Sequence, residues 1–379
     1  MSKDNPDPTI TALFESAAQI VTRKKKWEKL GYSCDPCDPL LPLNQPKAFY
    51  GEKDQRFRDL IANIIDFIQE PKNDVLLLKG PQGSGKTIFA QIFKEYSQQL
   101  NIVASYQDAA TFFVENVLQT TDTLSFSSNI ESEDVIFLDN AFHLHKTIRK
   151  LLSMKTPATS NTPKIIAIMD SSEFEVYRRL CIQKGDKSYQ YFLSMPYLNS
   201  INIRDLLQRR ISVCYGKQTI PVFFNNIINE ISTMAFGNPG LAIRILEEAL
   251  KFSRSLEDLR FSFGIDPRGL NDFPPSKSPI LREILVREVQ NEFLSLTRRE
   301  YLIHKDLTHL MNKTKSTISH HLGDLLSLNL IYEQTTARDK REKAYRPNKT
   351  IIGILEHLAF ERFYTEDALA TSEGINREK

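Results

Sequence analysis

Short apolar runs separated by helical or polar segments recur through the first half of the chain. Three of them cover residues 75–78, 134–139 and 165–170, and the last two end in an aspartate. Residues 102–106 form a further strand-like run, and residues 109–118 have helical spacing. Short apolar strands that alternate with helices are typical of a parallel sheet covered by helices. We therefore predict an α/β core.

The second half of the chain shows a different pattern. From about residue 202 the apolar positions recur at helical spacing only, which predicts short helices over 206–213, 223–234 and 241–250. Proline residues then mark 265–279 as a linker. Between the strands of the first half, residues 119–133 are rich in Ser, Thr, Asp and Glu, which predicts a loop.

The last patterned region predicts three helices followed by a two-stranded hairpin. The helices are expected over 280–293, 305–311 and 314–328, and the strands over 330–333 and 344–346, with a charged tip between them. This order of elements is typical of a winged helix-turn-helix domain.

Composition narrows the class of protein without naming it. Hydrophobic residues make up 41% of the chain and charged residues 25%, as in ordinary soluble domains. No run approaches the roughly 20 apolar residues that cross a bilayer, so we expect no membrane partner and a cytoplasmic location, at the nucleoid or in a nucleus. The net charge of +2 means that nucleic acid can be bound only through local basic patches.

Four cysteines are too few for a disulfide scaffold. Cys34 and Cys37 form a C-x-x-C pair in a proline-rich connector, but no second pair completes a zinc site. We expect two thiols there; a redox or metal role for the pair is the alternative.

One segment carries a specific chemical signal. It reads Gly80-Pro81-Gln82-Gly83-Ser84-Gly85-Lys86-Thr87, the complete G-x-x-x-x-G-K-[ST] pattern of a phosphate-binding loop, between an apolar strand and a helix. Its glycines let backbone amides surround a polyphosphate at the helix N-terminus. Lys86 is expected to reach the β- and γ-phosphates, and the Thr87 hydroxyl to bind Mg²⁺. The sequence therefore predicts that a nucleoside triphosphate binds.

Asp139 ends an apolar run at the place where phosphate-loop ATPases keep the acidic residue that holds Mg²⁺. An aspartate that caps the next helix is the alternative. Together with the phosphate loop, residues 45–260 resemble the AAA+ ATPases, which implies ATP as the nucleotide and Thr87 and Asp139 as Mg²⁺ ligands. That family places a glutamate next to activate water, and this chain has Asn140. An amide can orient water but cannot accept its proton, so we expect slow hydrolysis and an ATP-controlled switch.

The same resemblance implies roles for other polar residues. Asp170 or Ser171 occupies the position that senses the γ-phosphate, and Arg178 and Arg179 lie where the family carries an arginine finger for a neighbouring subunit. This implies a homo- or hetero-oligomer with other AAA+ subunits; a solvated pair of helix arginines is the alternative. Arg244, in a segment similar to the family's lid helix, is implied to contact the nucleotide.

The run from Ser316 to Tyr345 resembles the recognition helix and wing of ArsR- and MarR-type regulators, which implies double-stranded DNA as a partner. Short polar side chains on the helix are expected to reach base edges or phosphates, and basic side chains of the wing to meet phosphates. The expected contacts are Lys315, Ser316, Thr317, Ser319, His320, Arg338, Lys340, Arg341 and Lys343. Winged helices also dock proteins, and that alternative stays open.

These inferences divide the chain into six segments. They are an N-terminal helix and connector (1–48), an AAA+ core (49–200), a helical lid (201–264), a linker (265–279), a winged helix-turn-helix domain (280–362) and a polar tail (363–379). This order resembles the origin-recognition and replication-initiator ATPases of archaea and eukaryotes, which implies ATP-switched DNA binding. The alternative is an ATP-gated transcriptional regulator or a STAND-like signalling NTPase whose winged helix binds a promoter or a protein.

Overall fold

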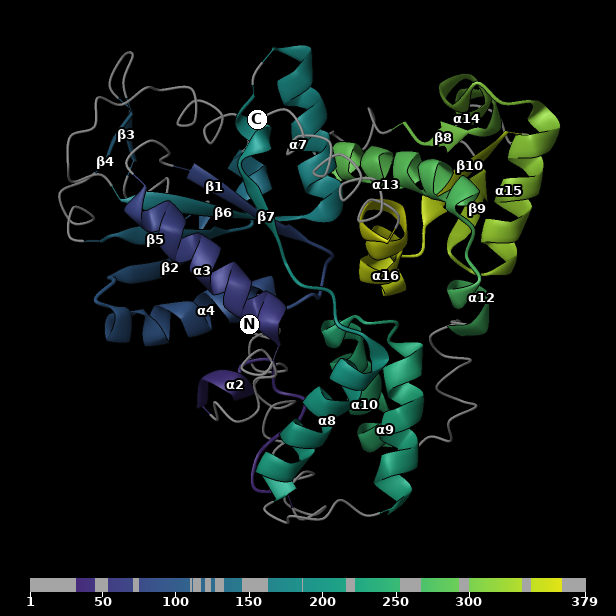
Figure 1. Ribbon diagram of the computed structural model, residues 1–379. Helices are drawn as coiled ribbons and strands as arrows, with labels where there is room; N and C mark the ends of the chain where they lie inside the picture. Colours follow the sequence, from purple (N-terminus) through teal and green to yellow (C-terminus); the bar gives the residue numbers. More distant parts are fainter. Residues whose placement is uncertain are drawn as a thin grey trace, which may run out of the picture.

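In a computed structural model of the protein, the described residues are 32–44, 54–70, 75–109, 111, 117–119, 124–126, 133–144, 163–185, 187–215, 222–252, 267–292, 300–335 and 342–362. Figure 1 shows a sheet with its helices, a helical bundle below it, and a third unit beside both. The predicted N-terminal helix and polar tail lie outside the described residues.

A five-stranded parallel sheet forms the core of the first unit. It consists of β1 (Val75–Gly80), β2 (Ala104–Asp108), β5 (Val135–Asp139), β6 (Lys164–Asp170) and β7 (Phe192–Ser194), in the order β2-β5-β6-β1-β7. The apolar residues of β1, β5 and β6 are buried because helices cover the sheet. The predicted parallel α/β sheet is confirmed.

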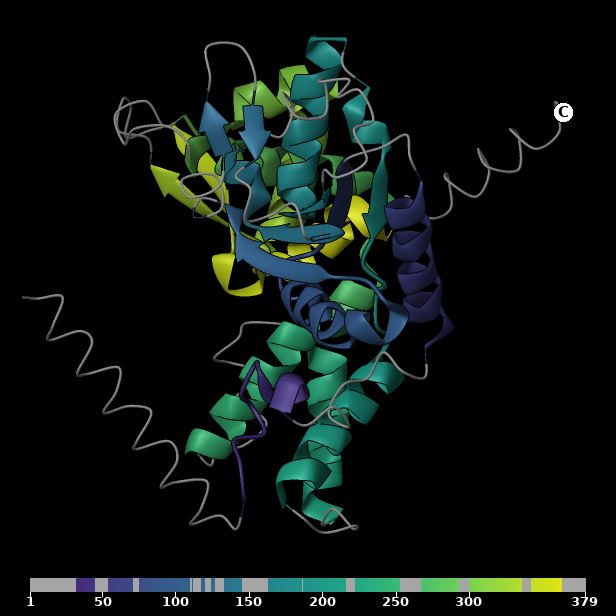
Figure 2. The same ribbon diagram turned by 90° about the vertical axis from the view of Figure 1, so that its left-hand side faces the viewer.

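The helices of this unit follow from the same pattern. α3 (Gln55–Gln69) begins at Asp54, whose carboxylate accepts the Arg56 N–H at 3.0 Å. Figures 1 and 2 show α4 (Lys86–Ser97) and α7 (Ser171–Gln183) on opposite sides of the sheet. Short 3₁₀ turns complete the unit: η3 (Gln98–Leu100), η5 (Ala141–Leu144) and η6 (Ser188–Gln190).

Parts of the core differ from the prediction. β3 (Val117–Gln119) and β4 (Leu124–Phe126) form a small antiparallel pair, so the expected helix end and the expected loop are both wrong there. β7 is a three-residue edge strand with two exposed side chains, and it lacks the apolar run that marks its neighbours. The short helix α2 (Leu41–Asn44) lies within the proline-rich connector.

Three helices form the bundle below the sheet. α8 (Ser200–Tyr215), α9 (Val222–Met234) and α10 (Pro239–Phe252) correspond to the three predicted helices. They bury Ile203, Ile228 and Ile245 against one another, as an amphipathic helix pattern requires. We call this bundle the lid. No described helix is both long and apolar enough to cross a membrane.

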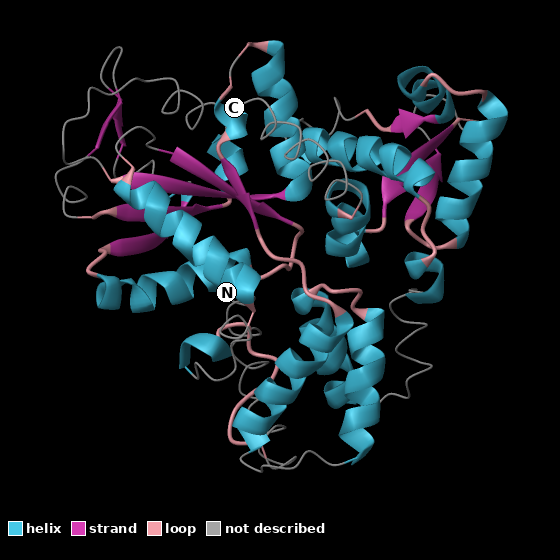
Figure 3. Cartoon of the chain, in the orientation of Figure 1, coloured by secondary structure: helices cyan, strands magenta, loops and turns pink. Residues whose placement is uncertain are grey.

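The third unit, which we call the C-terminal unit, contains the expected helices and hairpin (Figure 3). Its helices are α12 (Pro267–Asn271), α13 (Ser278–Glu292), α14 (His304–Met311), α15 (Lys315–Ser327) and α16 (Ile352–Glu356), with the short helical turns η7 (Pro275–Lys277), η9 (Lys349–Ile351) and η10 (His357–Glu361). β8 (Leu302–Ile303), β10 (Lys343–Pro347) and β9 (Ile331–Thr335) form an antiparallel sheet in that order.

Two features of this unit were not predicted. α12 lies within the segment expected to be only a linker. The unit is also not detached from the core, because α13 packs on α7 and Arg179 of α7 pairs with Glu283 of α13 at 2.5 Å. That the hairpin and helices act as a winged helix remains a prediction.

A disulfide joins Cys34 of the connector to Cys214 near the end of α8, across 180 positions of sequence. Cys37 and Cys181 are buried and lie outside this disulfide. The expectation that Cys34 and Cys37 are both thiols is therefore wrong for Cys34. Arg210 holds the same connector, because its guanidinium donates to the carbonyls of Pro36 and Asp38 at 3.1 and 2.9 Å.

The disulfide predicts a thiol count and a stability change. After unfolding without reductant, two of the four cysteines should react with a thiol reagent, and reduction should lower the melting temperature. Reduction releases a loop of this length in the unfolded chain, and the entropy that the unfolded chain gains lowers the free energy of unfolding by at most about 5 kcal/mol. A Cys34→Ser/Cys214→Ser double variant should show no change on reduction. Four reactive thiols in the unreduced protein would contradict the bond.

Candidate nucleotide site

The phosphate loop joins β1 to α4 at the carboxyl edge of the sheet. Gly83 and Gly85 have φ angles of 77° and 95°, a left-handed conformation that side chains other than glycine rarely adopt. Gly85 is the N-cap of α4, so the backbone turns tightly just before Lys86 and Thr87 open the helix. The two glycines therefore give the loop the wrapped shape that a polyphosphate needs.

Lys86 lies at the centre of the site and is 7% exposed. Its Nζ donates to the carbonyls of Gly80 and Pro81, at 2.8 and 3.0 Å, and to Asp170 Oδ1 at 2.8 Å. Asp170 ends β6, and its position opposite Gly80 in the strand register brings it to the loop. The buried ammonium is thus held beside the loop with all three donors used.

The expected metal ligands lie next to each other. The Thr87 hydroxyl donates to Asp139 Oδ2 at 2.7 Å, and the Tyr106 hydroxyl donates to the same oxygen at 2.6 Å. Burial, and then the Asp139 carboxylate, raises the pKa of Tyr106, which therefore stays a donor at neutral pH. A hydroxyl and a carboxylate beside a phosphate loop are the oxygen ligands that Mg²⁺ takes together with phosphates and water. The residues present fit that ion.

Asn140, the expected water-orienting residue, directly follows this aspartate. Its φ is 54°, and its side-chain amide donates to Asp108 Oδ2 at 2.9 Å. Asp108 ends β2 and pairs in register with Asp139. Sequence reasoning missed Asp108, although it ends a strand as Asp139 and Asp170 do. A carboxylate on the neighbouring strand thus holds the Asn140 amide.

A cavity of 360 Å³ lies beside the loop, which is within the range of small-ligand sites. Its polar wall is residues 82–87 with Asp139, Asn140 and Asp170, and its apolar wall includes Pro39, Phe57, Leu206 and Ile243. Buried Arg210 of α8 also lines it, and sequence reasoning missed this residue. Gly80 and Pro81 hold Lys86 through their carbonyls rather than line the cavity.

The three arginines expected at the site are placed differently. Arg178 and Arg179 both donate to Glu175 of their own helix, at 2.8 and 2.9 Å. Arg244 of α10 donates to the Thr350 carbonyl and lines a separate cavity of 230 Å³ between the loop, the lid and the C-terminal unit. A finger role for the first two and a nucleotide contact for Arg244 stay predictions.

The C-terminal unit contacts the phosphate loop from outside. Glu356 of α16, which is 1% exposed, accepts the Gln82 N–H at 2.5 Å and the Ser172 N–H at 3.1 Å. Burial, and then the nearby Asp170, raises the pKa of Glu356 to about 8. Nothing in the sequence marks Glu356, because its setting arises only from packing.

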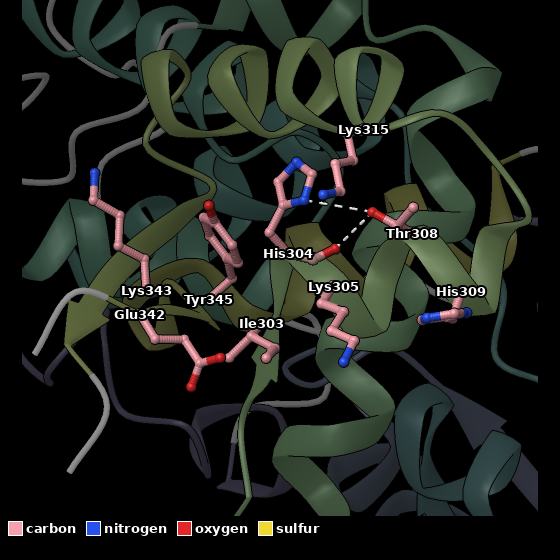
Figure 4. A pocket seen from close by; sticks show the side chains of 9 residues that line it. All are labelled: Ile303, His304, Lys305, Thr308, His309, Lys315, Glu342, Lys343 and Tyr345. Carbon is pink, nitrogen blue, oxygen red and sulfur yellow. Dashed lines mark hydrogen bonds between the residues drawn. The ribbon is translucent and has the colours of Figure 1, made fainter. Parts of the chain in front are cut away.

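A second cavity, of 610 Å³, lies in the C-terminal unit between α14, the start of α15 and β10 (Figure 4). Its lining is Ile303, His304, Lys305, Thr308, His309, Lys315, Glu342, Lys343 and Tyr345. Three lysines against one glutamate give it a positive charge. We call it the basic pocket. Its lining includes Lys315, which was expected on the recognition helix, and Lys343, which was expected on the wing. It also includes side chains of α14 that sequence reasoning left out.

The other expected DNA contacts lie around this pocket. Lys315, Ser316, Ser319 and His320 are exposed on α15, and Thr317 is half-buried. The Ser319 hydroxyl lies 2.9 Å from His304 Nε2, which connects the exposed face of α15 to the pocket. Lys343 pairs with Glu333 at 2.6 Å. Arg338, Lys340 and Arg341 lie outside the described residues, and DNA contact by any of these side chains stays a prediction.

The site geometry and the sheet agree on the fold. A phosphate loop follows β1, Asp139 ends β5 two strands away, and a helical lid follows the last strand. The predicted α/β fold of the AAA+ kind is confirmed.

Comparisons with known proteins give distant likenesses only. No family model matches the chain, and no curated protein matches its sequence. Among solved structures it is similar to the ORC2 protein of Aeropyrum pernix (15% identity, 82% of this chain and 93% of that chain, TM-score 0.40). It is also similar to the ORC1 protein of the same organism in complex with DNA (13% identity, 83% of this chain and 94% of that chain, TM-score 0.39). A third similar structure is Cdc6p of Pyrobaculum aerophilum (16% identity, 81% of this chain and 94% of that chain, TM-score 0.38). These sequence identities and TM-scores are too low to indicate a function, so the function is argued from the site alone.

The buried carboxyl of Glu356 predicts a pH dependence of stability. Burial raises the pKa of this carboxyl from 4.5, its value in an unfolded chain, to about 8 in the folded protein. The free energy of unfolding should therefore fall as the pH rises through this window, by at most about 1.4 kcal/mol per pH unit. Urea unfolding at pH 5.5 and 8.5 should show this loss in the wild type relative to Glu356→Gln. An equal difference between the two proteins at both pH values would contradict a buried, titrating carboxyl.

Proposed function

We propose that the protein binds ATP with Mg²⁺ and that the bound nucleotide controls its binding to double-stranded DNA. The observation that carries the proposal is the convergence of Lys86, Thr87 and Asp139 at the mouth of one cavity beside the phosphate loop. The apolar wall of the cavity suits a base, and the loop suits the phosphates. A role in a process such as replication initiation is implied only by the order of the domains, which resembles that of replication-initiator ATPases.

The residue after Asp139 favours a protein that ATP binding switches over one that hydrolyses ATP repeatedly. Asn140 cannot accept a proton from water, and its amide is already bonded to Asp108. We infer slow hydrolysis. In such a protein the nucleotide sets the angle between core and lid, and this shifts a population of states. DNA is the partner of the C-terminal unit because residues 313–349 carry eight basic and four acidic side chains.

One observation supports a second candidate function. The C-terminal unit docks on the phosphate loop through Glu356, which suits a regulator or a signalling NTPase whose nucleotide state gates oligomerisation. In that case the exposed face of α15 binds a promoter or a protein partner. Footprinting on origin-like repeats and on promoters separates the two functions.

Removal of the loop lysine should weaken nucleotide binding by about one to two orders of magnitude, because a charge-assisted contact to phosphate is lost. Lys86→Ala should show this in calorimetric titration with ATP and Mg²⁺. Lys94→Ala is the matched control, since it removes an exposed lysine from the other end of α4. Undiminished binding to Lys86→Ala would refute the site.

The basic pocket and the wing should contribute separately to DNA binding. Each lysine or arginine that neutralises a phosphate adds about 0.9 to the slope of log affinity against log salt. Lys305→Ala/Lys315→Ala should flatten that slope by up to about 2, and alanine at Arg338, Lys340 and Arg341 by up to about 3. Fluorescence anisotropy across a salt series measures both. Lys184→Ala, at the exposed end of α7, is the control, and unchanged slopes in the charge variants would reject the DNA surface.

A further inference from the structure

We propose that Glu356 is a positioning residue of the nucleotide site, through which nucleotide binding and the docking of the C-terminal unit favour each other. The inference rests on the nucleotide binding proposed above and adds a residue from outside the AAA+ core to that site. It requires that Glu356 hold the loop in its binding shape from the side away from the cavity.

The contacts of Gln82 give the first part of this argument. Its N–H donates to Glu356 of α16 at 2.5 Å, and its carbonyl accepts from Asn238 Nδ2 of the lid at 2.7 Å. The next carbonyl, that of Gly83, accepts the Gly240 N–H at 2.9 Å. These backbone groups of the loop are therefore fixed by two other units of the protein. A loop held in this way loses less entropy when it closes around phosphates.

The same short helix also holds the start of α7, which directly follows β6. Glu356 Oε1 accepts the backbone N–H of Ser172 at 3.1 Å and its hydroxyl. One turn further, Glu361 accepts the Ser171 hydroxyl at 2.8 Å. These serines directly follow Asp170, the partner of Lys86. α16 and η10 thus contact both the phosphate loop and the first turn of α7, which follows the aspartate that pairs with Lys86.

Gly353 makes this close docking geometrically possible. A Cβ atom at this position would overlap the carbonyl oxygen of Gln82 and the side-chain amide of Asn238. The helix therefore approaches the phosphate loop and the lid more closely than any residue with a side chain would allow. A methyl group there should separate α16 from the loop without removing a polar contact of its own.

The adjacent residue places the helix at the junction of core and lid. The His357 ring stacks on Tyr197, with centroids 3.6 Å apart and an interplanar angle of 7°, and the Tyr197 hydroxyl donates to the Phe236 carbonyl of the lid. Burial, and then Arg362, lowers the pKa of His357 to about 3, so the ring is neutral. Because Tyr197 lies between β7 and α8, a change in the angle between core and lid must alter this contact. The docked helix can therefore respond to the nucleotide through the loop and through the hinge.

The test measures binding of a fluorescent ATP analogue with Mg²⁺ to full-length variants. Glu356→Ala and Gly353→Ala should each bind about tenfold more weakly than wild type, since the loop loses an outer contact. Glu356→Gln should lie between wild type and Glu356→Ala, because one acceptor oxygen remains. Glu292→Gln is the control: this carboxylate is in the same unit, is half exposed, and pairs with Lys349 rather than with the loop.

A second measurement follows the docking itself. Because the coupling is reciprocal, ATP should slow amide hydrogen exchange over residues 352–358 in wild type and have less effect in Gly353→Ala. If Glu356→Ala does not fold, Ser172→Ala removes one donor to the carboxyl and should weaken binding about threefold.

Wild-type affinity in folded Glu356→Ala and Gly353→Ala, with wild type itself binding, would overturn this inference alone. A wild type that binds no nucleotide would overturn the proposed function and this inference together.

Discussion

The backbone of the phosphate loop has to present amides to an anion on one side while its remaining polar groups find partners on the other. In this chain the partners of Gln82 and Gly83 come from outside the core. Gln82 is held by the lid through Asn238 and by the C-terminal unit through Glu356, at 2.7 and 2.5 Å. The three units therefore meet at one residue, and buried polar groups are costly to leave unpaired. The arrangement of the units depends on this meeting point.

A consequence is that one unit carries two different surfaces. α16 contacts the phosphate loop from the side away from the nucleotide cavity, while the basic pocket and the exposed side of α15 belong to the same packed body. A shift of that body relative to the core would change the orientation of Lys315 and its neighbours toward DNA. Nucleotide control of DNA binding then needs only a change of population between two arrangements, and rapid hydrolysis is unnecessary.

Local signals allowed much of this to be predicted from sequence. The glycine spacing fixed the loop, and apolar runs ending in Asp139 and Asp170 gave two strands of the sheet. Features set by distant contacts were missed. The Cys34–Cys214 bond spans 180 positions, and the exposed edge strand β7 is only three residues long. Glu356 resembles any helix glutamate until packing buries it.

The central claim is that the nucleotide state sets DNA affinity, and DNA binding by fluorescence anisotropy tests it most directly. The measurement compares ATP, ADP and no nucleotide across a salt series, with one double-stranded probe and the full-length chain. The account predicts salt-sensitive binding whose affinity differs between the ATP and nucleotide-free states. Equal affinity in all three states would contradict the switch, and absence of binding in every state would assign the C-terminal unit to a protein partner.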